Sequence, residues 1–459
     1  MVKKAGILAA AALLTAPKWL PRQVVALRGR VFEFVNGDNA ITFPNERIGP
    51  ESFREIYANP AARGRSAGAG LSDLFWYWLS PGPEVHQEHL EDGPRYDDVA
   101  RTTLRILSGP SDQLAATAAR CTAAVLDELS AGRVTLVRLR DLMMPVWAAF
   151  CYELVFREPC PRVARDLIVG HADDVVTALK CTGLRHLGRR ARLTRYLARR
   201  VAAGDVPPEF LPETLSQREQ IHYLQGTLFN TAVVQMSEGM AHLLLALARH
   251  PAVQERAAAG SDRYLGQVLD ETLRLYPLFG IAHRITTAEI DLGEQGKLSP
   301  GSVLCFSYPG YHATGYDDPD TFDPSRWERI SAREAHHIPF GIAANRPCPA
   351  WRLAPLALRA CAREVLRRFT LDSTVSHTRP LPNRAPCLLI RRGERPPAAV
   401  HLALRVFLRV RDRWEDVWRP LVQLGLGTWM VLDARRQRLA GSYFDTHDRQ
   451  GCPVRHRVH

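Results

Sequence analysis

Apolar residues recur along most of the chain at the three- and four-residue spacing of an α-helix. The pattern is clearest over residues 351–369. A capping-box pattern at Ser216 and Glu219 opens a longer apolar stretch that continues to Arg249. The same spacing predicts further helices at about residues 50–57, 111–129, 137–156, 162–180, 185–203 and 262–276.

Strand signals are short and lie mostly outside these helices. Residues 24–43 lean toward β structure, and residues 28–39 within them predict a hairpin. Residues 297–306 predict a turn that enters a strand. Near the C-terminal end, residues 400–419 predict a helix, and residues 425–445 mix strand and turn signals. The expected fold class is therefore mainly α with a small β region.

The length and the two ends predict one large domain with an addition at each end. We expect an N-terminal apolar helix, a main domain and a C-terminal extension of unknown role, at residues 1–20, 21–398 and 399–459. Lys3 and Lys4 precede a short apolar run that cannot span a bilayer. A packed helix ending near Pro17 is one interpretation of it, and a signal peptide and a membrane-surface helix are the alternatives.

Charge and cysteine content narrow the class of protein. The chain has 459 residues and a formal net charge of +12, with arginines concentrated between Arg185 and Arg200. We interpret that cluster as a solvated basic face and expect no nucleic-acid partner, because aromatic interleaving is missing. The nine cysteines form no Cys-x-x-Cys motif, so neither a zinc site nor a disulfide framework is predicted. This usage favours a cytoplasmic location, with membrane contact only through the N-terminal segment.

One cysteine stands in a distinctive loop. Pro339-Phe340-Gly341 opens the loop, which carries Arg346 and Cys348 before the helix predicted from residue 351. A helix N-terminus and a neighbouring cation both favour a thiolate. A thiolate can ligate a metal such as heme iron, whereas a buried structural cysteine is the alternative that this loop alone leaves open.

Two further motifs precede this loop. Glu271 and Arg274 lie one helical turn apart, and Phe322-Asp323-Pro324-Ser325-Arg326-Trp327 follows them. The order Glu-x-x-Arg, Phe-x-Pro-x-Arg-Trp and cysteine loop resembles the cytochrome P-450 family of heme-thiolate monooxygenases. The resemblance covers roughly residues 30–395.

The resemblance implies the mainly helical cytochrome P-450 fold and one heme b. The heme would be bound without covalent attachment, because no Cys-x-x-Cys-His motif is present. Cys348 would be the axial ligand, Arg346 and Arg284 would bind heme propionates, and Glu271, Arg274 and Arg326 would form a structural triad. The other implied cofactor-binding residues are Phe340 in the cysteine loop and, near Arg95, His86 or His89, which could equally be surface histidines.

The chain departs from the family pattern in the cysteine loop. Phe340 precedes Cys348 by eight positions, where seven is usual, and alanines replace the usual glycines at Ala344 and Ala350. The added bulk should change how the backbone approaches a porphyrin.

A second departure lies on the long helix. The family has an acid followed by threonine where this chain has Val234 and Gln235. Three residues could replace the missing proton donors: the Gln235 amide, Thr231 one turn earlier, and Glu238, the nearest carboxylate. Either the chemistry has changed or this part of the helix has drifted structurally.

These features predict a monooxygenase that inserts oxygen from O₂ into a hydrophobic small molecule, in specialised metabolism. Apolar candidates for substrate contact are Phe229, Phe279 and Ile281. Ferredoxin and ferredoxin reductase are the expected electron donors, and a basic face at Arg346, Arg352 and Arg359 would suit an acidic ferredoxin. Two alternatives stay open. One is a heme-thiolate enzyme that bypasses O₂ activation, as a peroxygenase, isomerase, dehydratase or group transferase. The other is a non-catalytic heme-binding or gas-sensing protein.

Overall fold

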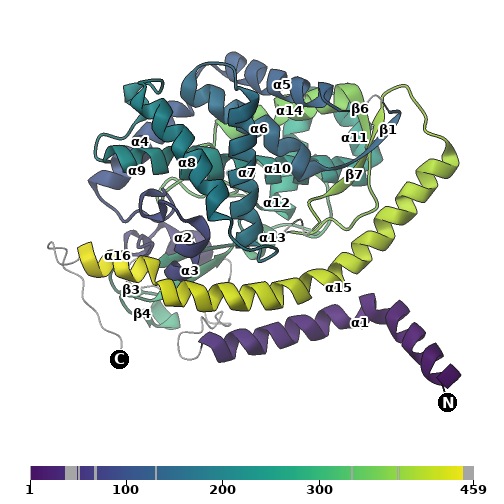
Figure 1. Ribbon diagram of the computed structural model, residues 1–459, viewed down its shortest axis with the longest axis horizontal. Coiled ribbons are helices and arrows are strands. Elements are labelled where there is room, and N and C mark those ends of the chain that lie inside the picture. The colour runs from purple at the N-terminus through teal and green to yellow at the C-terminus, as the bar shows by residue number, and fades with distance from the viewer. Residues whose placement is uncertain are drawn as a thin grey trace.

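A continuous helical segment through the middle of the molecule organises the fold (Figure 1). The computed structural model describes residues 2–36, 49, 52–66, 70–129, 132–331, 334–379, 381 and 383–447. Its α-helices are α1 (Val2–Asn36), α2 (Phe53–Ala58), α3 (Gly70–Leu79), α4 (Pro94–Ile106), α5 (Ser111–Asp127), α6 (Leu139–Phe156), α7 (Arg162–Leu179), α8 (Leu187–Ala202), α9 (Gln217–Tyr223), α10 (Val233–Arg249), α11 (Pro251–Ala259), α12 (Asp262–Leu275), α13 (Tyr308–Ala313), α14 (Leu353–Arg368), α15 (Ala398–Gln437) and α16 (Leu439–His447).

We call residues 217–249 the central helix. It begins at the predicted capping box, where Glu219 N–H donates to Ser216 Oγ at 3.4 Å and Ser216 N–H donates to Glu219 Oε2 at 2.9 Å. Helices α6, α12 and α14 pack around α10. Within the described residues, this is the one helix long and apolar enough to cross a membrane. However, 83% of its most apolar window is buried inside the protein, as expected for a core helix.

The central helix changes its winding in the middle. Residues Leu224–Ala232 form a π-helix between α9 and α10. Such segments are rare and occur frequently at functional sites, because they rotate side chains out of α-helical register. Gly226 lies in this segment, and a Cβ there would come within 3.2 Å of His86 Cδ2. The absent side chain therefore allows His86 to pack closely against the helix.

The β region is small, as predicted. The described strands are β1 (Val134–Arg138), β2 (Ile281–Ile285), β3 (Ile290–Asp291), β4 (Lys297–Leu298), β5 (Val303–Ser307), β6 (Phe369–Asp372) and β7 (Pro386–Arg391). They form an antiparallel sheet in the order β1-β7-β6 and the antiparallel pairs β2-β5 and β3-β4. Strand β7 is the middle strand of its sheet and is buried over most of its length, which explains its continuous apolar run.

The terminal helices α1 and α15 run along the same side of the molecule (Figure 1). Helix α15 crosses this side and α1 packs along it. Arg28 on α1 donates to Gln423 Oε1 on α15 at 2.8 Å, and Gln423 Nε2 donates to the Lys180 carbonyl at 2.9 Å. Asp433 on α15 accepts a hydrogen bond from Tyr77 on α3 at 2.8 Å. The C-terminal extension is therefore attached to the main body along its length.

Both terminal predictions need correction. Residues 28–36 continue helix α1 past Pro17 and Pro21, so the predicted hairpin at 28–39 is wrong where the structure describes it. Residues 37–43 of the β-leaning segment lie outside the described residues. Residues 425–445 belong to α15 and α16 rather than to strands. In both places the helix packs against another element, and this tertiary contact outweighs local propensity.

Candidate active site

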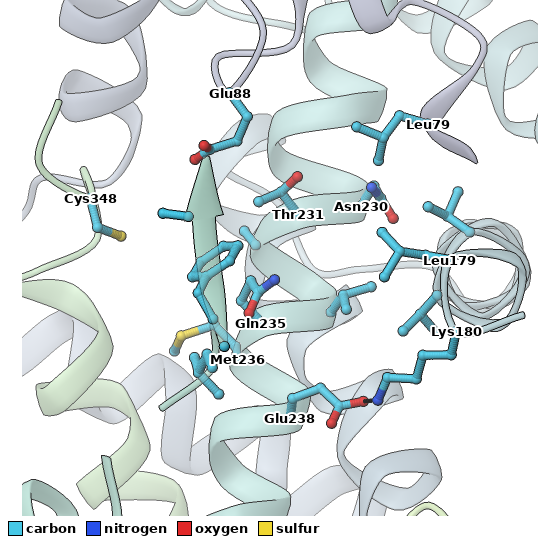
Figure 2. A pocket seen from close by; sticks show the side chains of 18 of the residues that line it. Leu79, Glu88, Leu179, Lys180, Asn230, Thr231, Gln235, Met236, Glu238 and Cys348 are labelled. Carbon is cyan, nitrogen blue, oxygen red and sulfur yellow. Dashed lines mark hydrogen bonds and ion pairs between the residues drawn. The ribbon is translucent and has the colours of Figure 1, made fainter. Parts of the chain in front are cut away.

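A cavity of about 840 Å³ separates the Cys348 loop from the central helix. Figure 2 shows the Cys348 side chain directed into the cavity from one side and Thr231, Asn230 and Gln235 reaching it from the central helix. The volume lies within the range of roughly 300–1,000 Å³ typical of small-molecule sites.

The Cys348 loop is held by its own backbone. Cys348 N–H donates to the Phe340 carbonyl at 2.9 Å, which closes the loop across its extra residue. Gly341 and Arg346 both have positive φ, at 73° and 51°. Helix α14 begins only at Leu353, so Cys348 does not lie in its first turn. Burial raises the pKa of the Cys348 thiol to about 11, contrary to the expectation that the helix terminus and Arg346 lower it.

Arg346 and Arg284, which come from separate segments of the chain, both line the cavity. Arg346 donates to the Leu90 carbonyl and to Asp92 Oδ1, the latter at 2.7 Å. Arg284, on β2, donates to the Tyr57 hydroxyl. The Nε atom of each arginine is buried without a hydrogen-bond partner in the described structure. Because the Arg346 side chain is only 5% exposed, it does not belong to the expected basic docking face.

The histidines His86 and His89 lie in a turn after the short 3₁₀ helix Pro83–Val85, not on the helix that the resemblance implied. His86 Nε2 is 2.6 Å from Thr231 Oγ1, and His89 Nδ1 is 3.1 Å from Ser66 Oγ. Burial lowers the pKa of His86 to about 4 and that of His89 well below its usual value. Both are therefore neutral near pH 7, and neither is a surface histidine.

Arg95, which was expected beside these histidines as a propionate partner, points elsewhere. Its Nη2 lies 2.6 Å from Glu219 Oε1. Arg95 does not line the cavity. This part of the resemblance therefore fails for Arg95.

An ion pair that the sequence did not indicate lies beside these residues, with Arg65 buried and Glu88 exposed. The guanidinium of Arg65 contacts the Glu88 carboxylate, and Arg65 Nε donates to the Glu88 carbonyl at 2.8 Å. Desolvation alone would raise the pKa of Glu88, but Arg65 together with the smaller contributions of His86, Arg346 and His283 holds the pKa below its usual value. Both side chains line the cavity, and Glu88 points into it (Figure 2). Arg65 belongs to no motif, so only tertiary structure could reveal it.

The three candidate catalytic residues on the central helix all line the cavity but differ in their contacts. Thr231 is hydrogen-bonded to His86. Gln235 has no side-chain hydrogen bond within the part of the chain that the structure describes, while Asn230 Oδ1 and Thr227 Oγ1 are buried without partners. Thr227, Asn230 and Thr231 come from the π-helix and Gln235 from the first turn of α10, and all four line the cavity.

Glu238 is paired with two cations. Its Oε1 lies 2.7 Å from Lys180 Nζ and 2.9 Å from Arg140 Nη1. Burial would raise the pKa of Glu238, but these two cations lower it to about 2. The carboxylate is therefore ionised and held in place by two cations, and its role in a proton path stays a prediction.

The apolar lining also differs in part from the prediction. Phe279 and Ile281 line the cavity, but Phe229 is fully buried and stacks on Phe156 at a centroid distance of 6.2 Å. Its neighbour Leu228 lines the cavity instead. The unexpected π-helix changes which of these neighbours faces inward.

Glu271, Arg274 and Arg326 meet in one buried network. Arg274 Nε and Nη2 donate to the two Glu271 oxygens, each at 2.9 Å, and Arg326 Nε donates to Oε1 at 3.0 Å. Trp327 Nε1 adds a hydrogen bond of 3.1 Å. The Glu271 side chain is 0% exposed, so every contact is made away from water.

This network reaches the cysteine loop through one histidine. The Arg274 carbonyl lies 3.3 Å from His312 Nδ1, and Ile338 N–H donates to His312 Nε2 at 3.1 Å. Burial lowers the pKa of His312 to about 3, so the ring is neutral and can both donate and accept. Ile338 stands immediately before the Pro339-Phe340-Gly341 turn.

Comparison with known proteins agrees with this arrangement. The family model for cytochrome P-450 matches residues 211–395. A putative cytochrome P-450 135B1 of Mycobacterium tuberculosis is 32% identical over 199 residues, and the match spans 40% of this chain and 40% of the relative. Cyclooctat-9-en-7-ol 5-monooxygenase of Streptomyces melanosporofaciens is 32% identical over 122 residues, which span 22% of this chain and 26% of the relative.

Solved structures extend the agreement over most of the chain. A 6-coordinated cytochrome P-450 from Thermus thermophilus aligns with a TM-score of 0.59 and 16% identity, covering 80% of this chain and 98% of the other. Cytochrome P-450 OleT in complex with arachidonic acid aligns with a TM-score of 0.62 and 14% identity, covering 84% and 98%. At these identities the alignments establish the fold alone.

The chain belongs to the cytochrome P-450 family.

Cytochrome P-450 proteins are heme-thiolate oxidoreductases, and the residues of this cavity fit a heme. Cys348 would supply a sulfur ligand, and metal coordination deprotonates a thiol even where burial raises its pKa. The unpartnered Nε–H groups of Arg284 and Arg346 are suited to bind the carboxylates of a macrocycle. Arg284 lies far from Arg346 and Cys348 in the sequence, and all three line one cavity.

Proposed function

We propose that this cytochrome P-450 chain is a heme-thiolate monooxygenase that inserts oxygen from O₂ into a hydrophobic small molecule in specialised metabolism. The observation that carries the proposal is the position of Cys348 across one cavity from the polar side chains of the central helix. A heme b ligated by a thiolate supplies O–O bond cleavage when bound.

The chain's own residues have distinct roles in this proposal. Cys348 ligates the iron, and the guanidinium groups of Arg284 and Arg346 neutralise the propionates. Glu271, Arg274 and Arg326 act at a distance, because their network contacts, through His312, the segment that leads into the Phe340 turn. His89 and Phe340 complete the wall of the heme site.

Thr231 and His86 are the proposed proton-handling pair. Their side chains are 2.6 Å apart, and a neutral imidazole can pass a proton to or from a hydroxyl. Gln235 can orient a water or substrate through its amide but cannot carry a proton. The pair would therefore replace the acid and threonine that the family has at positions 234 and 235.

Substrate and partners follow from the cavity and the surface. Leu79, Leu179, Phe279 and Ile281 give the cavity an apolar stretch that favours a hydrophobic molecule. Ferredoxin and ferredoxin reductase are the proposed electron donors. Because Arg346 is buried, Arg352 and Arg359 are the residues that remain of the expected basic face. A cytoplasmic location is proposed, with membrane contact only through the N-terminal segment.

A second candidate is a heme-thiolate enzyme that bypasses O₂ activation. The observation that favours it is the ionised Glu238, which leaves no carboxylic acid available at this level of the central helix. A peroxygenase needs no external proton delivery to O₂, and an isomerase, dehydratase or group transferase needs no O₂.

The first test concerns the ligand. The purified heme-containing protein is reduced and exposed to carbon monoxide, and Cys348→Ser should lose the thiolate-type absorption band while keeping its circular dichroism spectrum. Cys305→Ser, which changes a half-buried cysteine outside the cavity, is the matched control and should keep the band. Retention of the wild-type band by Cys348→Ser would show that another residue ligates the iron.

The second test separates the two candidate functions. Apolar probe molecules are supplied either with reduced ferredoxin and isotopically labelled O₂ or with peroxide alone. Label from O₂ in the product supports the monooxygenase. Product from peroxide alone, with none from O₂, supports the alternative.

A further inference from the structure

The cavity wall farthest from the cysteine loop is provided in part by the C-terminal extension. Arg411, Glu415, Trp418, Arg419 and Val422 line the cavity. Their spacing places them on one face of α15. The matched family region ends at residue 395, so this wall belongs to the part of the chain that follows it.

Cationic side chains outnumber carboxylates at this wall. Glu415 and Glu238 are the carboxylates that line it. The principal cations are Arg28, Arg140, Lys180, Arg379, Arg411 and Arg419. Arg28 and Lys180 are linked through Gln423, which accepts from Arg28 and donates to the Lys180 carbonyl, and Lys180 and Arg140 share Glu238.

Several of these cations have no anionic partner. Among the described residues, no carboxylate lies within ion-pair distance of Arg28, Arg379 or Arg411, although Glu415 lies close enough to interact electrostatically with Arg411. Arg379 donates only to the carbonyls of Pro277 and Leu278. Burial lowers the pKa of Lys180 to about 8 even though Glu238 is its partner. Clustered cations of this kind repel one another, and an anion placed among them relieves the repulsion.

The remaining lining lies between this wall and Cys348. Leu79 and Leu179 come from α3 and the end of α7, and Figure 2 shows both on the same side of the central helix as Lys180. A molecule with an apolar body and one charged end would match both regions at once. Guanidinium groups suit a carboxylate or a phosphate, since each can accept paired hydrogen bonds.

We infer that the substrate is an amphiphile whose anionic carboxylate or phosphate group binds the arginines that α15 presents, with its apolar body extending toward Cys348. This inference rests on the proposed function for its reaction. The binding preference itself can be measured without turnover.

The test compares ligands that share one alkyl chain. Isothermal titration calorimetry of the heme-containing protein with dodecanoate, dodecyl phosphate and dodecanol, each kept below micelle formation, measures three affinities. We expect at least one anion to bind on the order of tenfold more tightly than the alcohol, with the advantage shrinking as salt rises. A preference for only one of the two anions identifies whether the bound headgroup is a carboxylate or a phosphate. Equal affinities, or a preference for the alcohol, overturn the inference.

Variants test which residues are responsible. Arg411→Gln combined with Arg419→Gln should remove most of the anion preference and leave dodecanol affinity unchanged. Arg409→Gln removes the same kind of charge from an exposed position on α15 outside the cavity lining and should keep the preference. If the double variant also keeps it, α15 does not bind the headgroup. The carbon monoxide spectrum of the same samples tests the heme assignment separately, because the calorimetric comparison does not depend on that band.

Discussion

The two ends of the cavity are built in different ways. At the Cys348 end, the cysteine loop and the Glu271 network come from segments that carry recognisable motifs, and His312 links the two. At the α15 end, the wall joins residues from α1, α6, α7 and α15 that belong to no motif. The first end follows what the family shares, and the second is where this chain can differ from its relatives.

The two ends also handle buried charge differently. Glu271 accepts hydrogen bonds from two arginines, a tryptophan and a backbone N–H, so its charge is fully compensated. Around Glu238 and Glu415 the cations are in excess. A compensated network stabilises the fold, whereas an excess of one sign leaves binding capacity for a ligand.

The largest effect is expected at the compensated network. Glu271→Gln leaves Arg274 and Arg326 buried without a negative partner and should lower the free energy of unfolding by about 3–5 kcal/mol. Chemical denaturation measures this loss, and heme content measured alongside it should fall. Glu328→Gln is the control, because its ion pair with Arg256 is exposed and should contribute less than about 1 kcal/mol. Equal losses in both variants would mean that the network does not stabilise the Cys348 end.

The next effect concerns Glu238 and depends on pH. Its pKa is about 2 in the folded protein and about 4.5 when unfolded, so its stabilisation is fully present above about pH 5 and is lost as pH falls toward 2. Glu238→Gln should lower the free energy of unfolding at pH 7 by roughly 3 kcal/mol and flatten the acid part of the stability curve.

Denaturation curves collected from pH 7 down to pH 3 measure this flattening. Glu289→Gln, which breaks an exposed pair with Lys297, should leave the curve unchanged. A Glu238→Gln curve parallel to that of the wild type would contradict the proposed strength of the Lys180 and Arg140 pairing.

The smallest effect is expected where α15 meets the main body. Asp433 accepts hydrogen bonds from Tyr77 and Gln437 at 2.8 and 2.9 Å. Asp433→Asn should cost about 1 kcal/mol and should speed hydrogen exchange in the C-terminal half of α15, without changing the carbon monoxide band. Asp445→Asn on α16, whose partner Arg438 is exposed, should change neither quantity. Unchanged exchange in Asp433→Asn would show that other contacts hold α15 in place.

Much of the fold follows from the sequence. The capping box at Ser216 and the end of the central helix at Arg249 were predicted within a residue, because caps and prolines act locally. The π-helix at residues 224–232 was not predicted, since its apolar pattern is compatible with an ordinary α-helix. The hairpin predicted at 28–39 is wrong over residues 28–36, because these residues continue α1, which packs against α15.

The candidate site likewise contains residues that the sequence predicted and residues that it did not. Cys348, Arg346, Arg284 and Gln235 were predicted from motif positions, and all of them line the cavity, while their catalytic and binding roles stay predictions. Arg65 and Lys180 were missed because neither stands in a motif. His86 was predicted as a candidate cofactor-binding residue, but its contact with Thr231 was not. The two side chains are 2.6 Å apart and the residues 145 positions apart, so no local sequence pattern could indicate the contact.

By itself, the sequence determined the order of the helices, the cysteine loop and the Glu271 network, because helix periodicity, caps and short motifs act over a few residues. Only the tertiary structure decided that Glu238 is neutralised by Lys180 and Arg140, that His86 reaches Thr231, and that α15 brings its arginines to the cavity. Burial and charge depend on which distant segments pack together, and the pKa of each group in this cavity follows from that packing.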